Sequence, residues 1–252
     1  MYTPVDVRLL EETLVDLYQG GALLSEARLT MILLALALGA LFSPQHSATI
    51  SFGVGNASRC CGPGEQCHRC FGDSAGSQVP QSNSLAHTIF ELGFRLFLAQ
   101  GSALGVFTPG TWETAVCAHL AVSYLLSRGQ ADSSHAAWQV LGSGIRIALS
   151  LGLHCDQSKW NLSAQKAHTH ARVYWELHVY ERLQSLNFGR PATLPEYVGC
   201  PPPFQIPPLA LSGVPQSVPP HPDVFHAIKY QLCPLYNKIN LLHSKDDLPE
   251  IH

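Results

Sequence analysis

The fold is decided by two stretches, residues 136–156, AAWQVLGSGIRIALSLGLHCD, and residues 171–203, ARVYWELHVYERLQSLNFGRPATLPEYVGCPPP. In the first stretch, apolar or small residues recur at alternating steps of three and four, which is the period of an amphipathic α-helix. These residues are Trp138, Leu141, Ile145, Ala148 and Gly152. The second stretch lies mostly in a helix that we predict over 164–187. A Gly-Arg-Pro triplet at 189–191 ends this helix, because glycine followed by proline is typical of helix C-termini.

The helix predicted over 136–151 carries two further signals. An Asp-Ser-Ser triplet at 132–134 precedes it and supplies side chains that commonly cap a helix start. Gly142 and Gly144 lie in its middle, where glycine lowers helix stability. We therefore expect a neighbouring helix to pack closely against these two glycines.

Helical periodicity extends to other parts of the chain. It is found over 5–19, 25–42, 85–99, 112–127 and 223–242. The helix over 25–42 is apolar on all sides and is expected to be central in the core. Thr111 is the candidate N-cap of the helix over 112–127, and Pro234 interrupts the last helix. Because no stretch alternates with the period of a β-strand, the sequence predicts an all-α, multi-helix globular domain.

Two segments between the helices have a different composition. Residues 53–84 are rich in Gly, Ser, Cys and Gln, and we predict a long loop inserted into the domain. Residues 195–222 are rich in proline, which excludes regular structure there. The predicted organisation is a regulatory helical domain over 1–204, a proline-rich connector over 205–222, and a truncated continuation of the helical domain over 223–252.

The composition restricts what the chain can bind directly. Its 252 residues are 46% hydrophobic and 13% charged, with a net charge of −3 and no block of Lys or Arg. These residues therefore lack the basic surface with which proteins grip a phosphate backbone. The most apolar run, residues 29–42, is shorter than the roughly 20 residues that cross a bilayer. Without a secretory signal, the cysteines are expected to be reduced thiols of a cytosolic or nuclear protein.

A cysteine cluster in the predicted loop is the one candidate metal site. Cys60, Cys61, Cys67 and Cys70 lie close together, and Cys67 and Cys70 have the spacing of a zinc-ligand pair. No second pair follows at zinc-finger spacing, so we interpret them as incidental loop cysteines. A small helical metal-binding protein or enzyme that uses this loop is the alternative.

The sequence contains no catalytic motif. It has no Gly-x-Ser-x-Gly, no phosphate-binding glycine loop after a strand, and no His-Glu-x-x-His. His154, Cys155 and Asp156 have suitable chemistry, but neighbours along a chain rarely face one another as catalytic groups must. We therefore predict no catalytic residue, no cofactor and no bound metal in this chain, and we do not read it as an enzyme.

The two stretches that decide the fold resemble the fungal-specific transcription factor domain, the middle homology region of zinc-cluster regulators of the xylanolytic-activator type. That family has a helix ending in Ala-x-x-Leu-Gly-Leu-His-x-Asp, then a helix with an Arg-x-x-Trp-Trp core, an Asp-Arg pair and Gly-Arg-Pro. The first element is matched by Ala148, Leu151, Gly152, Leu153, His154 and Asp156. The second is matched by Arg172, Trp175, Arg182, Gly189, Arg190 and Pro191. Tyr174 stands in place of the first Trp, and Glu181 stands in place of the Asp.

The resemblance implies a nuclear protein that regulates transcription. DNA binding and zinc would belong to an N-terminal zinc cluster that is absent from this chain. The resemblance also implies dimerisation with a related regulator, and a small-molecule effector bound in a cavity between the helices. A partner that does not bind DNA and pairs with intact regulators is a further alternative.

The charged residues of the resemblance are expected to be architectural. Arg172 and Glu176 are four residues apart on a helix and can pair. Arg190, at a helix end, is suited to clamp a carboxylate or backbone carbonyls. Our hypothesis is that Arg182, Glu181 or Arg190 joins a buried polar network that holds the helix over 164–187 against the helix over 136–151.

Overall fold

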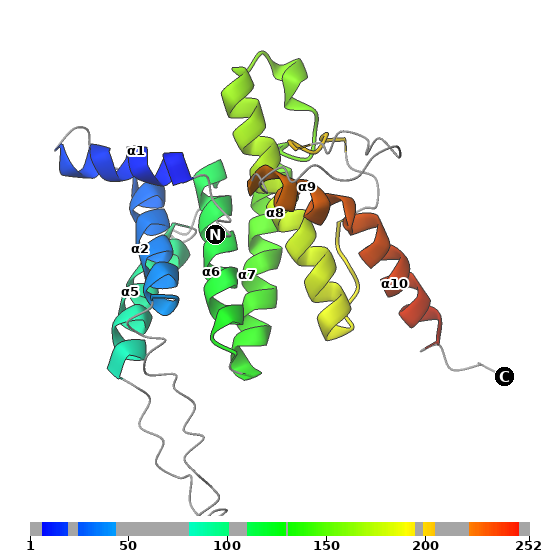
Figure 1. The fold of residues 1–252 in the computed structure, drawn as a ribbon, viewed down its shortest axis with the longest axis horizontal. Helices are drawn as coiled ribbons and strands as arrows, with labels where there is room; N and C mark the ends of the chain where they lie inside the picture. The colour runs from blue at the N-terminus through cyan, green and yellow to red at the C-terminus, as the bar shows by residue number, and fades with distance from the viewer. Residues whose placement is uncertain are drawn as a thin grey trace, which may run out of the picture.

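A computed structural model describes residues 7–19, 25–43, 81–100, 110–129, 131–194, 199–204 and 222–246. Every regular element in these ranges is a helix, which confirms the all-α prediction (Figure 1). The helices are α1 (Val7–Tyr18), α2 (Glu26–Leu41), α5 (Gln81–Ala99), α6 (Trp112–Ser127), α7 (Ala131–Ser150), the short 3-10 helix η3 (Gln157–Trp160), α8 (Ala164–Phe188), α9 (Pro222–Gln231) and α10 (Cys233–Asp246).

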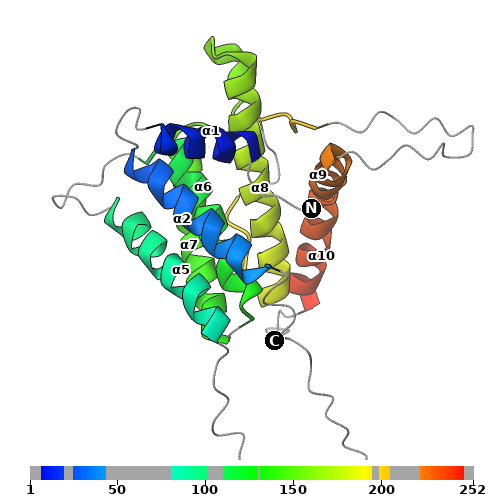
Figure 2. The same cartoon turned by 60° about the vertical axis from the view of Figure 1, so that its left-hand side comes forward.

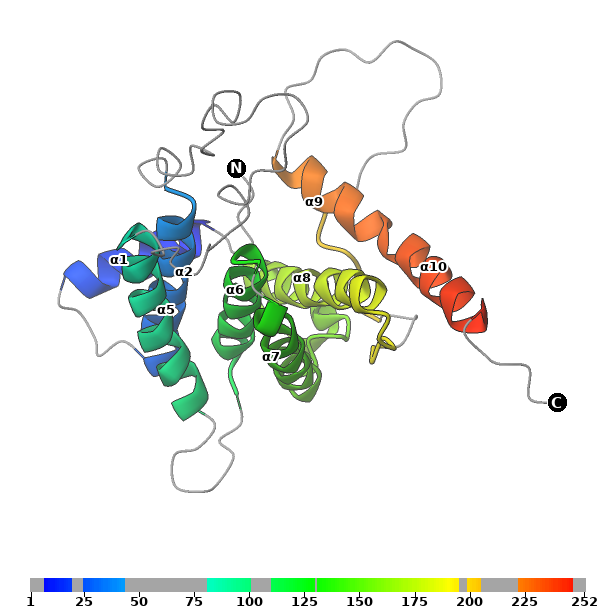
Figure 3. The same ribbon diagram turned by 90° about the horizontal axis from the view of Figure 1, so that it is seen from below.

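The helices pack mainly against their neighbours across the molecule. α2 and α5 form one side, α6 and α7 lie in the middle, and α8 follows them (Figures 1 and 2). α9 and α10 lie along the other side of α8 and follow each other almost in line (Figure 3). α8 is therefore the helix that connects the main bundle to α9 and α10.

The most buried helix is α6. All residues from Thr114 to Leu125 are buried, because α6 packs between α2 on one side and α7 and α8 on the other. The expectation that the helix over 25–42 is central was wrong. α2 buries Met31, Leu34 and Ala37, but its Leu36 is 50% exposed, since α2 lies at the side of the bundle.

The helix ends follow the predicted signals with one exception. Thr111 caps α6 and forms a reciprocal capping box with Thr114, as predicted for the N-cap. Gly189 ends α8 in the left-handed conformation with φ of 60°, which glycine adopts without strain. The Asp-Ser-Ser triplet at 132–134 does not precede α7 as a cap. It lies within the first turn, because α7 begins at Ala131.

One of the two predicted close glycine contacts is present. A Cβ atom on Gly144 would lie 2.7 Å from the Cβ of Ala118 on α6, so the glycine allows the two helices to approach closely, as predicted. Gly142 differs. The nearest atom to its Cβ position belongs to Arg146 of the same helix, so no neighbouring helix requires glycine there.

The predicted interruptions lie partly outside the described residues. Gln81–Ser84, assigned to the inserted loop, belong to α5, whereas 53–80 lie outside the description. Residues 199–204 form no helix or strand. The break predicted near Pro234 is confirmed, because α9 ends at Gln231 and α10 begins at Cys233. Pro234 therefore sits in the first turn of a helix, where proline is tolerated.

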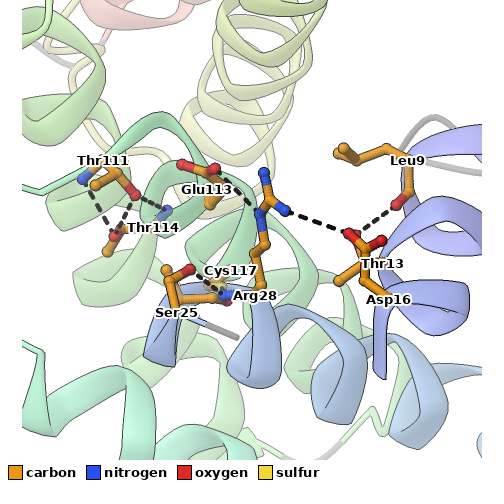
Figure 4. Close-up of polar contacts among 10 residues, drawn as sticks. Leu9, Thr13, Asp16, Ser25, Arg28, Thr111, Glu113, Thr114 and Cys117 are labelled. Carbon is orange, nitrogen blue, oxygen red and sulfur yellow. Dashed lines mark hydrogen bonds and ion pairs between the residues drawn. The ribbon is translucent and has the colours of Figure 1, made fainter. Parts of the chain in front are cut away.

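A group of polar contacts joins α1, α2 and α6 at one end of the bundle (Figure 4). The guanidinium of Arg28 lies 3.7 Å from a carboxylate oxygen of Asp16 on α1 and 3.7 Å from one of Glu113 on α6. The thiol of Cys117 on α6 donates to the backbone oxygen of Ala27 on α2. Because Arg28 and Asp16 are substantially exposed, these ion pairs position the helices more than they stabilise them.

Candidate functional site

α8 carries an unusual set of buried polar side chains. Glu176 and Glu181 are each 1% exposed, and His178 and Arg182 are each 3% exposed. Burying charge lowers stability unless each group finds a close partner. The partners of these groups show what α8 holds in place.

The partners of Glu176 come from α9. One carboxylate oxygen, Oε1, accepts from Nδ1 of His226 at 2.8 Å and from the hydroxyl of Tyr230 at 2.8 Å. The other oxygen, Oε2, accepts from Nζ of Lys229 at 2.5 Å. Burial raises the pKa of Glu176, but the bond from His226 and the charge of Lys229 outweigh burial and lower the pKa to about 2. Glu176 is therefore charged at neutral pH and attaches α9 to α8.

His119 of α6 adjoins this cluster. Its Nε2 lies 4.0 Å from Oε2 of Glu176, and neither of its ring nitrogens has a hydrogen-bond partner among the described residues. Burial lowers the pKa of His119 to about 4. The imidazole is therefore neutral at pH 7, and its edge packs against the ring of Tyr180.

Glu181 and Arg182 bind the segment that follows α8. Glu181 accepts from the backbone N–H groups of Thr193 and Leu194, and also from the hydroxyl of Thr193. Arg182 donates to the backbone oxygen of Leu194 at 2.6 Å and to Oδ1 of Asn237 on α10 at 2.7 Å. The pair therefore joins α8 to its own returning chain and to α10.

Arg190, just after the end of α8, makes a contact of a different kind with α7. The Arg190 guanidinium lies 5.2 Å from the ring centre of Trp138 on α7 and 5.5 Å from that of Phe188. It also approaches Nδ1 of His135 at 2.9 Å. The expected carboxylate or carbonyl clamp is thus replaced by stacking on aromatic rings. Of the three residues in the hypothesised network, Arg190 does reach α7, at Trp138 and His135, although its contact with His135 is exposed. The bonds described above for Glu181 and Arg182 run to residues 193–194 and to α10, so a buried network that holds α8 against α7 stays a prediction.

The residues that match the first element of the family pattern lie between α7 and η3 and form a tight turn. Gly152 has φ of 70°, and a Cβ atom there would lie 2.1 Å from the ring of Trp160, so no larger residue fits. Leu153 is buried. Asp156 caps η3 by accepting from the backbone and hydroxyl of Ser158. Leu151 and His154 are partly buried in the same turn.

Arg172 and Trp175 hold the segment 199–204 against α8. The indole N–H of Trp175 donates to the backbone oxygen of Cys200 at 3.2 Å. The guanidinium of Arg172 lies 5.7 Å from the ring centre of Phe204. Pro191 is exposed just after the α8 cap. The hydrogen bond and the cation–ring contact hold the described segment 199–204 beside α8.

A pocket of about 520 Å³ lies between α8, the segment 199–202 and the start of α10. We call it the α8–α10 pocket. It is lined by Asp156, Trp175, His178, Arg182, Gly199, Cys200, Pro201, Pro202, Cys233, Pro234 and Asn237.

Nδ1 of His178 in this pocket has no hydrogen-bond partner among the described residues. Burial, together with the charge of Arg182, lowers the pKa of His178 to about 4. Burial raises the pKa of the Cys200 and Cys233 thiols to about 12, so both are neutral. Because His178 is also neutral at pH 7, the charged side chains of the described lining are Arg182 and Asp156.

The resemblance implied a cavity between the helices, but no pattern of residues in the sequence located this pocket. Trp175 and Arg182 were singled out for their place in a helix, whereas Cys200, Cys233 and Asn237 had no recognisable pattern. The pocket arises because residues far apart along the chain meet beside α8. The local pattern that the sequence offers is a histidine, His178, followed one helical turn later by an arginine, Arg182.

The described residues contain no group of three His, Cys, Asp or Glu side chains able to hold a metal ion. Cys60, Cys61, Cys67 and Cys70 lie outside these residues, so the prediction about the loop stays a prediction. No described helix has both the length and the apolar character for crossing a bilayer.

The family comparison decides where the chain belongs. The model of the fungal-specific transcription factor domain matches residues 17–201, which run from the end of α1 to the pocket segment. The chain belongs to this family. The family is one of transcription regulators, and this chain is accordingly a transcription-regulatory domain. α9 and α10 lie beyond the matched residues, although they supply the partners of Glu176 and one wall of the pocket.

Two curated relatives come from Schizosaccharomyces pombe. The uncharacterized transcriptional regulatory protein C1F7.11c is 32% identical over 124 residues, which are 48% of this chain and 15% of that protein. The uncharacterized transcriptional regulatory protein C530.05 is 32% identical over 57 residues, which are 23% of this chain and 8% of that protein. No solved structure matches the chain significantly. The aligned part of this chain thus spans only a small fraction of each relative's length.

Proposed function

We propose that this chain is the regulatory domain of a nuclear zinc-cluster transcription factor and controls a DNA-binding segment outside these 252 residues. The family match over 17–201 is the observation that supports this most strongly. The composition agrees with it, because the net charge is −3 and no Lys or Arg block is present. Zinc, in this proposal, belongs to the DNA-binding segment.

The attachment of α9 and α10 to α8 supplies a physical means of regulation. These helices are held by specific polar bonds, those of Glu176 to α9 and that of Arg182 to α10. A helix held by a few buried polar bonds can be biased between two positions by a ligand or partner. We propose that such a bias is passed to the rest of the regulator. Pairing with a related regulator stays a prediction from the sequence.

The test is to tether the chain to a heterologous DNA-binding domain that lacks activity of its own. Transcription from a reporter carrying the matching DNA site is compared with that of the DNA-binding domain alone at equal protein level. We expect the tethered chain to raise or lower transcription. No difference between the two proteins would contradict the proposal.

A second measurement tests whether DNA binding belongs to a segment outside this chain. Fluorescence anisotropy with duplex DNA should show no salt-sensitive binding by the untethered chain, because its net charge is −3 and its sequence has no block of Lys or Arg. Tight binding that falls steeply with salt would show that the chain itself grips DNA.

A further inference from the structure

We infer that the α8–α10 pocket binds a small effector with an apolar, ring-bearing body and a single carboxylate group. This inference rests on the proposed function, because it assigns the ligand class to the regulatory domain. It is carried by the geometry of the pocket and by a buried polar atom in the pocket lining that lacks a partner.

The size and walls of the pocket define the body of the ligand. A volume of about 520 Å³ lies within the usual range for small-molecule sites, roughly 300–1,000 Å³. Trp175, Pro201, Pro202 and Pro234 supply apolar wall, and the two lining cysteines are neutral thiols. The indole of Trp175 is already oriented by its bond to Cys200. Such walls favour a flat apolar body, which gains by leaving water and by stacking on the indole.

The polar end of the ligand is indicated by His178. This side chain is 3% exposed, lines the pocket, and has an Nδ1 atom without a hydrogen-bond partner among the described residues. A buried polar atom without a partner lowers stability, and such atoms are rare in folded proteins. A ligand group that bonds to His178 would remove this cost. The ring nitrogen is therefore the feature that points to an occupant.

The charge of the ligand follows from Arg182. Arg182 is one helical turn from His178 and lines the same pocket. Glu181 points its carboxylate at Thr193 and Leu194. Asp156 is the acid of the described lining, and its carboxylate accepts from the backbone and hydroxyl of Ser158 at the start of η3 and lies 3.8 Å from Nζ of Lys159. A cationic ligand would be repelled by the guanidinium, whereas a monoanion is attracted. One lining cation suits one carboxylate better than a multiply charged phosphate.

Ligand binding in this pocket would act on the arrangement of the helices. Trp175, His178 and Arg182 belong to α8, and Cys233 and Asn237 belong to α10. A ligand that touches both helices stabilises the arrangement in which they lie together, in proportion to its affinity for that arrangement. The effector would therefore favour the attached position of α10.

The experiment uses the 252-residue chain with benzoate, phenylacetate, 3-phenylpropionate and indole-3-acetate as probes. The primary amide of each acid is the uncharged control. Thermal unfolding and titration calorimetry measure binding. We expect at least one acid to raise the Tm and to bind at least about tenfold more tightly than its amide. If no acid raises the Tm, or if amides bind as well as acids, the inference is wrong.

Two variants test the position of the site. His178→Leu removes the unpartnered nitrogen, and Ser185→Ala is its matched control. Ser185 is also buried on α8, and its side-chain oxygen has no hydrogen-bond partner among the described residues, but it is not part of the described lining of the pocket. Both variants should fold with a Tm at or above that of the wild type. Only His178→Leu should weaken acid binding, by about tenfold. Equal affinity in the two variants would overturn the assigned site.

The reporter assay separates this inference from the proposed function. If the tethered chain changes transcription but no acid binds, the regulatory function stands and the ligand inference fails. If an acid binds at His178 while the tethered chain never alters transcription, the binding site stands and the proposed function fails.

Discussion

Glu176 is the single residue on which the attachment of α9 most depends. Its carboxylate accepts from three α9 side chains, Lys229, His226 and Tyr230. Forming such a cluster and breaking it change the free energy of unfolding by different amounts. The intact cluster adds modestly to stability because its charges lose their hydration, whereas the loss of one partner leaves the others buried and uncompensated.

Replacing Glu176 should therefore be costly. We expect Glu176→Leu to lower the free energy of unfolding by about 3–5 kcal/mol, because Lys229 keeps a buried charge without its acid. Urea denaturation followed by circular dichroism measures the change. Glu91→Gln is the control, since Glu91 is an exposed acid on α5 whose ion pairs are worth about 0–1 kcal/mol. Equal effects of the two substitutions would show that the cluster does not stabilise the fold.

His119 and His178 should make stability depend on pH. The pKa of each is lowered to about 4 in the folded chain from the ordinary value of 6.5, so the unfolded chain binds more protons between these values. Stability is fully present above pH 6.5 and decreases as the pH falls toward 4. His178→Leu should flatten this decrease, whereas Ser185→Ala should keep the wild-type slope. The Tm measured between pH 7 and pH 4 checks this, and an unchanged slope in His178→Leu would refute it.

For single residues, the sequence predicts some backbone roles but not which side chains contact each other. Gly189 was predicted to end a helix from the Gly-Arg-Pro triplet, and it takes a positive φ at the end of α8. Gly152 was placed in the helical rhythm of the stretch 136–156, but it lies in the turn after α7 with a positive φ. The partners of Arg182 and Arg190 were not predicted. Arg182 bonds to Asn237 of α10, and Arg190 stacks on Trp138 of α7. Choosing between a carboxylate, a carbonyl and an aromatic ring requires knowing which element lies opposite, and helical periodicity carries no such information.

At the scale of elements, the contact between α6 and α7 depends on a small residue. A Cβ on Gly144 would lie 2.7 Å from that of Ala118, which is too close for two carbon atoms. A Cβ on Gly39 of α2 would have no neighbour within 4 Å. The same substitution should therefore have opposite effects at the two glycines.

Gly144→Ala should destabilise the domain by about 1–3 kcal/mol, because α7 must move away from α6. Gly39→Ala should stabilise it by roughly 0.5–1 kcal/mol, because alanine loses less backbone entropy in a helix. Chemical denaturation of both variants measures the difference. A stabilising Gly144→Ala would mean that the two helices are not in close contact at this position.

The positions of the helices along the chain were largely predictable from the sequence. Which helix is the most buried was not. Steps of three and four residues gave α1, α2, α6 and α8 within two residues of their observed limits. α5 and α7 begin four and five residues earlier than predicted, and the break before α10 was predicted from Pro234. The assignment of α2 as the central helix failed. Both α2 and α6 are apolar on every side, and only the packing of α2, α7 and α8 around α6 buries α6 completely.

At the scale of the whole molecule, the family match and the structure describe complementary parts. Residues 17–201 carry the family fold, while α9 and α10, beyond the match, complete the Glu176 cluster and the α8–α10 pocket. The pocket lies at the boundary between these two parts. Its position could not be predicted from sequence, because its walls come from four segments that are separated along the chain. In our account, regulation acts through the contact between α8 and the helices that follow it.

The most direct test of this account measures reporter transcription from the chain tethered to a heterologous DNA-binding domain. The wild-type chain, Glu176→Leu and Glu91→Gln are compared at equal protein level with the DNA-binding domain alone. We expect the wild-type chain and Glu91→Gln to change transcription to the same extent, and Glu176→Leu to alter or abolish this effect. Transcription equal to that of the DNA-binding domain alone for all three chains would contradict it.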